Sequence, residues 1–105
     1  MHDERLATPE RTWETYSGAL RSGDRETARF CLTESAEAER GPMLDSATSA
    51  QMRDWASSVR SVQARVDAGG STAMATASLQ NGRTASVSFM KTARGWRIAS
   101  LPQGL

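Results

Sequence analysis

Few side chains in this sequence have the types and spacing needed for nucleophilic or metal-dependent chemistry. The chain holds one histidine, His2, and one cysteine, Cys31. A Ser-His-Asp or Cys-His mechanism would have to use His2, which stands near the N-terminus, where chain ends fray. One Cys and one His cannot complete a tetrahedral zinc site, and one Cys cannot form an internal disulfide. We therefore predict no metal site and no cofactor, with His2 in a solvated terminus and Cys31 as a small buried residue.

Tyr16 is the remaining candidate for a catalytic role, as a hydrogen-bond donor from a helix. General acid–base catalysis also needs a titratable partner in a water-poor cavity, where burial shifts its pKa to a useful value. The last acidic residue along the chain is Asp67, and strand alternation turns it away from the expected core. The sequence therefore argues against an enzyme. An enzyme that uses Tyr16 as its hydrogen-bond donor is the alternative.

Length and composition define one small domain. The chain has 105 residues, of which 38% are hydrophobic and three are Trp, and this suits a single core. Its 13 basic and 12 acidic residues give a net charge of +1, which argues against bulk binding to nucleic acid. No apolar run approaches the roughly 18 residues of a membrane span, and residues 1–7 are too polar for a signal peptide. We expect a soluble protein without a membrane span, either cytoplasmic or an extracytoplasmic domain whose leader has been removed.

The N-terminal half has the apolar spacing of helices. Thr8-Pro9-Glu10 is typical of a helix start, with a hydroxyl cap, a proline at the first position and an acid near the positive end of the helix dipole. Trp13, Tyr16 and Leu20 follow at spacings of three and four, which places them on one helical face. We predict a first helix that ends at Gly23, a second over about Arg25 to Leu32, a solvated turn over Glu34 to Arg40 that ends at Gly41-Pro42, and a third helix near Ser49 to Arg60.

After about Ser61 the apolar period changes from 3.6 to 2, which indicates four antiparallel strands in a meander. The predicted connections are a two-residue Gly69-Gly70 turn, a three-residue Gln80-Asn81-Gly82 turn with Gly82 in a left-handed bulge, and a four-residue loop over Thr92 to Gly95. The resulting registers pair Val66 with Ala73, Ala77 with Ala85, and Phe89 with Ile98.

These registers divide the strand residues between two faces of the sheet. The predicted inner face is apolar: Val62, Ala64, Val66, Ala73, Ala75, Ala77, Leu79, Ala85, Val87, Phe89, Trp96 and Ile98. The predicted outer face is rich in Ser and Thr: Thr72, Met74, Thr76, Ser78, Thr84, Ser86, Ser88, Met90, Arg97, Ala99 and Leu101.

Two segments resemble motifs of a known superfamily. The first is Thr8-Pro9-Glu10 leading into an amphipathic helix and then Ala19-Leu20-Arg21-Ser22-Gly23-Asp24. The second is the hairpin Phe89-Met90-Lys91-Thr92-Ala93-Arg94-Gly95-Trp96-Arg97-Ile98. Their order and spacing resemble the small bacterial members of the nuclear transport factor 2-like (cystatin-like) superfamily. The resemblance implies an α+β cone, with helices packed into a curved four-stranded sheet, as one domain over residues 8–101 between a flexible N-terminus (1–7) and a C-terminal tail (102–105).

The resemblance also implies a choice of functions. Relatives include ketosteroid isomerases, dehydratases and polyketide cyclases, which hold a carboxylate or His base inside the cone. Larger relatives place two short strands between the second and third helices, whereas Thr33 to Thr48 here has no alternating apolar run. We therefore expect a shortened cone without a deep enclosed pocket.

A non-catalytic binding or accessory domain is the predicted function, with an isomerase- or dehydratase-like enzyme or a purely structural dimerisation module as alternatives. A small apolar ligand would lie among the largest inward side chains, unless these fill the cone themselves: Trp13, Tyr16, Met52, Trp55, Phe89 and Trp96. A homodimer would form through the outer face of the sheet, unless that face is merely solvated and rich in Thr for its strand propensity. The dimer candidates are Met74, Met90, Arg97 and Leu101.

Overall fold

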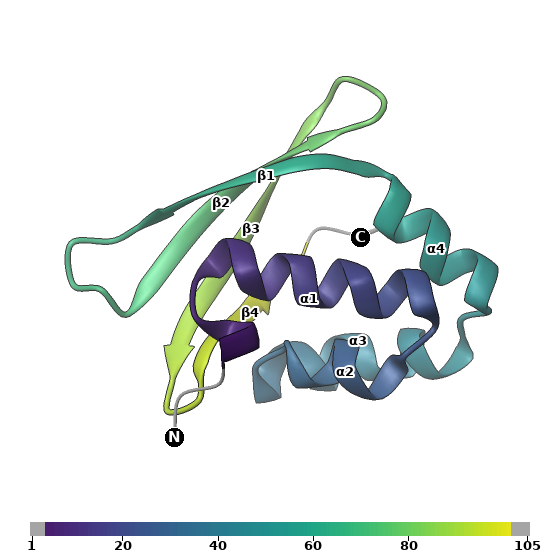
Figure 1. Ribbon diagram of the computed structural model, residues 1–105, viewed down its shortest axis with the longest axis horizontal. Coiled ribbons are helices and arrows are strands. Elements are labelled where there is room, and N and C mark those ends of the chain that lie inside the picture. The colour runs from purple at the N-terminus through teal and green to yellow at the C-terminus, as the bar shows by residue number, and fades with distance from the viewer. Residues whose placement is uncertain (1–3, 102–105) are drawn as a thin grey trace.

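The protein is described by a computed structural model, which covers residues 4–101. The predicted solvated position of His2 and the predicted tail at 102–105 lie outside the described residues. The elements follow in the order η1 (Glu4–Leu6), α1 (Pro9–Ser22), α2 (Arg25–Phe30), α3 (Glu34–Ser46), α4 (Ser49–Ser57), β1 (Val59–Val66), β2 (Thr72–Leu79), β3 (Thr84–Thr92) and β4 (Gly95–Ser100). Figure 1 shows the helices on one side of the twisted sheet, with α1 between β1 and the α2–α3 pair. This architecture confirms the predicted α+β class.

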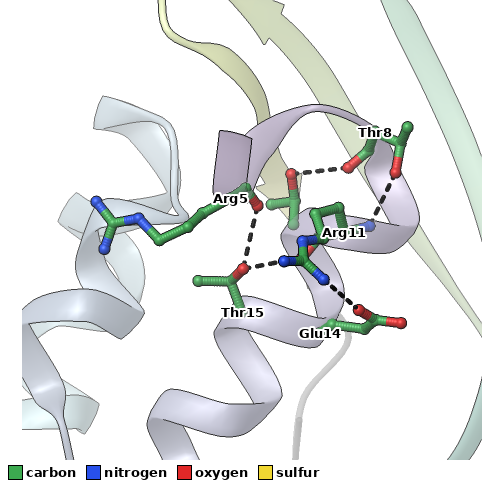
Figure 2. Close-up of polar contacts among 6 residues, drawn as sticks. Arg5, Thr8, Arg11, Glu14 and Thr15 are labelled. Carbon is green, nitrogen blue, oxygen red and sulfur yellow. Dashed lines mark hydrogen bonds and ion pairs between the residues drawn. The ribbon is translucent and has the colours of Figure 1, made fainter. Parts of the chain in front are cut away.

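Helix α1 begins and ends at the predicted residues. The Thr8 hydroxyl accepts a hydrogen bond from the Arg11 amide at 3.0 Å, as Figure 2 shows, and Gly23 ends the helix with φ of 75°. The short helix η1 is fastened to α1 because the Thr15 hydroxyl donates to the carbonyl of Arg5 at 3.1 Å. Leu6 of η1 is completely buried. The expectation that residues 1–7 form a flexible terminus is therefore wrong for Glu4–Leu6, which pack on the domain.

The sheet has the order β1-β2-β3-β4, and every pairing is antiparallel. Val66 pairs with Ala73, Ala77 with Ala85, and Phe89 with Ile98, so the three predicted registers are confirmed. The middle turn spans three residues, because the Leu79 amide donates to the Arg83 carbonyl at 2.8 Å and Gly82 has φ of 83°.

The two outer turns differ in detail from the prediction. In the first, the Gly70 amide donates to the Asp67 carbonyl at 2.9 Å, so the turn is centred on Ala68-Gly69 and Gly70 alone of the pair has positive φ. In the third, Thr92 pairs with Gly95, which leaves a two-residue connection in place of the four-residue loop. Both changes keep the strand registers, because each shifts the turn without shifting the ladder.

The largest correction concerns α3, which replaces the predicted short turn and runs through Gly41-Pro42 to Ser46. Proline inside a helix removes one hydrogen bond and normally interrupts it. Here side chains from α2 stabilise the C-terminal half: Arg29 donates to the Gly41 carbonyl at 3.2 Å, and Arg25 donates to the Leu44 carbonyl at 2.8 Å and also to that of Ala47. These donors lie 12 to 22 residues away in sequence, so local pattern could not predict them.

Helices α2 and α4 end earlier than the sequence predicts, and for the same reason. Helix α2 ends at Phe30, not Leu32, because residues 31–33 pair with β4: the Thr33 amide donates to the Ile98 carbonyl at 3.0 Å. Helix α4 ends at Ser57, not Arg60, because Val59 already pairs with Leu79. In both cases the residues expected in the last helical turn pair with a strand instead.

The face assignments hold along most of the sheet, with two exceptions. Val66 was predicted to face the core, yet it is 47% exposed, because the helices do not cover that end of β1. Leu101 was predicted on the outer face, but a bulge in the β3–β4 ladder pairs Ser100 with Ser88 while Ile98 pairs with Phe89. The extra residue, Ala99, reverses the alternation, and Leu101 packs against the core.

Candidate functional site

The predicted ligand-lining residues belong to one hydrophobic core. Tyr16, Met52 and Phe89 are fully buried, Trp13 and Trp96 nearly so, and Trp55 packs against the same cluster while remaining partly exposed. The rings of Trp13 and Tyr16 contact each other, with centroids 5.6 Å apart and planes tilted by 46°. The structure therefore brings these candidates together as packing partners, and it places Trp55 nearer the surface than we expected.

The hydroxyl of Tyr16 is the most unusual polar atom in this core. It is buried and has no hydrogen-bond partner among residues 4–101. Burial raises the pKa of Tyr16 to about 12; the positive charge of Arg40 opposes this rise and the Cys31 thiol adds to it. At neutral pH the phenol is therefore protonated, and it can donate a hydrogen bond but cannot act as a base.

Three polar residues that the sequence pattern does not place inward are buried: Thr12, Ser17 and Arg40. The Thr12 hydroxyl donates to the Trp96 carbonyl at 2.7 Å and so ties α1 to β4. Arg40 lies on the same face of α3 as Ala36 and Leu44, which are also buried. The spacing of four between these three residues was the signal available in the sequence, and the Gly41-Pro42 pair obscured it.

A shallow groove lies between α1 and the first half of β1. It has a volume of about 290 Å³. Of the six predicted lining residues, Trp13 lies in its wall. The remaining wall residues are mostly polar on α1 and mixed on β1: Glu10, Glu14, Ser17 and Arg21 from the helix, with Val59, Arg60, Ser61 and Val62 from the strand.

Two large apolar side chains, those of Met74 and Met90, are exposed on the outer face of the sheet. Met74 is 52% exposed and Met90 is 47% exposed. Ser88 stands opposite Met74 across the β2–β3 ladder, and Thr72 stands opposite Met90. Arg97, the cross-strand neighbour of Met90, is partly buried because its guanidinium lies 5.1 Å from the centre of the Phe30 ring.

Residues 4–101 contain neither a metal-binding cluster of side chains nor a membrane-spanning helix. Within residues 4–101, no three His, Cys, Asp or Glu side chains gather so that they could hold a metal ion. No helix in the same range is both long and apolar enough to cross a membrane.

No protein-family model matches the chain, and no curated protein sequence matches it either. Among solved structures, the chain is similar to a Campylobacter jejuni protein described as an NTF2-like transpeptidase, where NTF2 denotes nuclear transport factor 2. The two chains are 18% identical with a TM-score of 0.53, and the match covers 90% of this chain and 100% of the other. At this identity the similarity shows the fold alone. The chain therefore has the nuclear transport factor 2-like fold that its sequence motifs predicted.

Proposed function

We propose that this protein is a non-catalytic binding or accessory domain that acts through the surface of its sheet. The observation that carries the proposal is the contrast between the two faces of the sheet. The centre of the inner face is closed by the chain's own side chains, whereas Met74 and Met90 stand half-exposed on the outer face. Apolar side chains on an otherwise polar face are typical of a protein contact.

The chemistry of the interior supports binding over catalysis. Ala73, Ala75 and Ala77 form the buried centre of the inner face, and the phenol of Tyr16 stays protonated at neutral pH. An isomerase of this fold would need a base positioned beside that phenol. The cone interior therefore supports a packed core better than a reaction site.

The composition of the outer face favours a second sheet as the partner. A stable contact buries at least about 1,000 Å² in total, which is more than two methionines supply, so the surrounding Ser and Thr must take part. Their short side chains allow close approach of two sheets, and Met74 and Met90 fill the space between them. A second copy of this chain offers such a face.

Sedimentation of the wild-type chain and of Met74→Glu tests the proposal. We expect the wild type to form larger assemblies at high micromolar concentration than the variant does, because the glutamate would have to lose its hydration when two sheets meet. Met43→Glu is a matched control, since Met43 is 40% exposed but lies on α3. Equal association of the wild type and Met74→Glu would contradict the proposal for this face.

A further inference from the structure

The two edges of the sheet differ in whether the chain covers them. At the β4 edge, the Ile98 amide donates to the Cys31 carbonyl at 2.7 Å and the Ile98 carbonyl accepts from Thr33. At the opposite edge, β1 is the outermost strand of the sheet. Within residues 4–101, the sheet therefore has one edge paired with the segment before α3 and one edge available for pairing.

The register shows which backbone groups of β1 face outward. The Asp67 amide donates to the Thr72 carbonyl at 2.9 Å, so Asp67 and Thr72 form a hydrogen-bonded pair. Hydrogen-bonded pairs alternate along an antiparallel ladder. Val62, Ala64 and Val66 occupy the alternate positions, so their N–H and C=O groups point away from β2. These three residues form a regular stretch that begins beyond the bulge at Arg60.

The side chains of the same three residues are incompletely covered. Val62 and Ala64 are half-buried, and Val66 is exposed where the β1–β2 hairpin extends beyond the helices (Figure 1). Val62 lies in the wall of the groove that also contains Trp13. One end of the open strand thus carries an exposed apolar side chain, and the other end borders the groove, whose wall includes Trp13 and Val59 among polar residues.

We propose that a second copy of this chain pairs with the β1 edge, antiparallel and about a two-fold axis at Ala64. This register places Ala64 opposite its own equivalent and Val66 of the second copy opposite Val62. The exposed valine of each copy then lies beside the groove of the other, so each groove is completed by a residue from the second copy. The product is a continuous eight-stranded sheet.

Charges on the outer side of β1 are compatible with this register. Arg65 faces Gln63 of the second copy, and Asp67 faces Ser61, the residue after Arg60. No like charges stand directly opposite each other, and the acid approaches the end of the strand that carries a basic residue. On the inner side the opposed pairs are Val62 with Val66 and Ala64 with Ala64. The strand is therefore self-complementary on both faces.

This interface is separate from the outer-face contact of the proposed function, and either can exist without the other. The test therefore uses chains that carry Met74→Glu, which disables the outer face. Ala64→Pro removes an outward N–H and leaves the β1–β2 ladder intact. We expect the Met74→Glu chain to form a dimer at high micromolar concentration, and Ala64→Pro to weaken that dimer at least about tenfold. Ala64→Val, which keeps the N–H, should retain it.

Cysteine cross-linking provides a second measurement that does not depend on the proline variant folding. Hydrogen-bonded antiparallel residues have Cα atoms about 5.5 Å apart, which is within the range for a disulfide. Ala64→Cys should therefore cross-link under mild oxidation, whereas Ser35→Cys, exposed on α3, should not. Cys31 is buried and does not compete. A Met74→Glu chain that stays monomeric, or equal cross-linking from positions 64 and 35, would overturn the edge pairing.

Discussion

The β4 and β1 edges show how one small sheet can be well packed at one side and open at the other. Three contacts converge on β4: residues 31–33 pair with Ile98, Thr12 of α1 donates to the Trp96 carbonyl, and Leu6 of η1 packs over Gly95. At β1 the helix α1 leaves a groove, and Val66 at the far end is exposed. All four strands are joined by similar hairpins. The difference between the two edges therefore arises because the helical half of the chain packs against β4 more closely than against β1.

This comparison indicates where stability and association reside. Burial of apolar surface is the main favourable term in folding, and the side chains of β4 are more completely buried than those of β1. The open strand contributes less to the core and keeps backbone groups free for pairing. We therefore expect substitutions near β4 to change the free energy of unfolding, and substitutions on β1 to change association.

The largest expected effect is that of Trp96→Ala. Trp96 is 5% exposed, and its truncation removes buried surface and leaves a cavity, at a cost of about 3–5 kcal/mol in the free energy of unfolding. Domains of this size are stable by only about 5–15 kcal/mol, so the variant should be close to unfolding. Urea denaturation measures this. An unchanged midpoint would contradict the packed β4 side.

The next effect is the loss of stability at high pH through Tyr16. Because the pKa of Tyr16 is raised from 10 to about 12 in the folded chain, its contribution is complete below pH 10 and is lost as pH rises towards 12. The total loss is about 3 kcal/mol, since a tenfold change in proton affinity corresponds to about 1.4 kcal/mol. Thermal melts between pH 9 and 12 should show this loss in the wild type. Tyr16→Phe, which has no phenol to titrate, should lose less.

The chain offers a direct control, because Tyr16 is its single tyrosine. Ultraviolet absorbance of the folded protein therefore reports the ionisation of Tyr16 alone. An ionisation midpoint of Tyr16 near pH 10 would show that its hydroxyl is solvated. That result would contradict the burial of Tyr16 between α1 and the α2–α3 pair.

A smaller effect is expected for Gly95→Ala at the start of β4. Gly95 has φ of 133°, and an added Cβ would lie 2.5 Å from the carbonyl oxygen of Leu6. Strain and the displacement of η1 should destabilise the fold by about 1–3 kcal/mol. Gly82→Ala is the matched control, because Gly82 has φ of 83° with open space around it. If Gly95→Ala and Gly82→Ala lowered the melting temperature equally, the contact between η1 and Gly95 would not contribute to the stability of the fold.

The smallest effect is expected for Val66→Ala on the open strand. Because Val66 is about half exposed, the variant should change the free energy of unfolding by about 0.5 kcal/mol or less. The same substitution at Val87, which is fully buried on the same face of the sheet, should cost about 2 kcal/mol. Equilibrium unfolding of both variants measures the difference. Similar costs would show that β1 is as well covered as the centre of the sheet.

The sheet was the part of the fold most completely predicted from sequence. Each register follows from a turn of two to four residues and from apolar alternation, and both are local properties. The exceptions at Val66 and Leu101 have different causes. Val66 has the right parity but lacks a helix above it, whereas the bulge at Ala99 depends on contacts around the end of β4 that the sequence pattern does not show.

The helical half was predicted less completely, and α3 shows why. Its cap at Thr33 and its buried positions Ala36, Arg40 and Leu44 are present in the sequence, but Gly41-Pro42 indicates an interruption. The helix continues because Arg25 and Arg29 bind its carbonyls from α2. Five of the six predicted lining residues are buried and Trp55 is partly exposed, while the groove beside Trp13 depends on how closely α1 approaches β1.

By itself the sequence determined the fold class, the strand registers and the two faces of the sheet, because turn residues and apolar periodicity act over a few neighbouring positions. The tertiary structure alone decided the continuation of α3, the burial of Leu6 and Arg40, and the contrast between the covered β4 edge and the open β1 edge. Those features depend on contacts between residues far apart in the chain, and the free energy of such contacts is settled only when the helices and the sheet pack together.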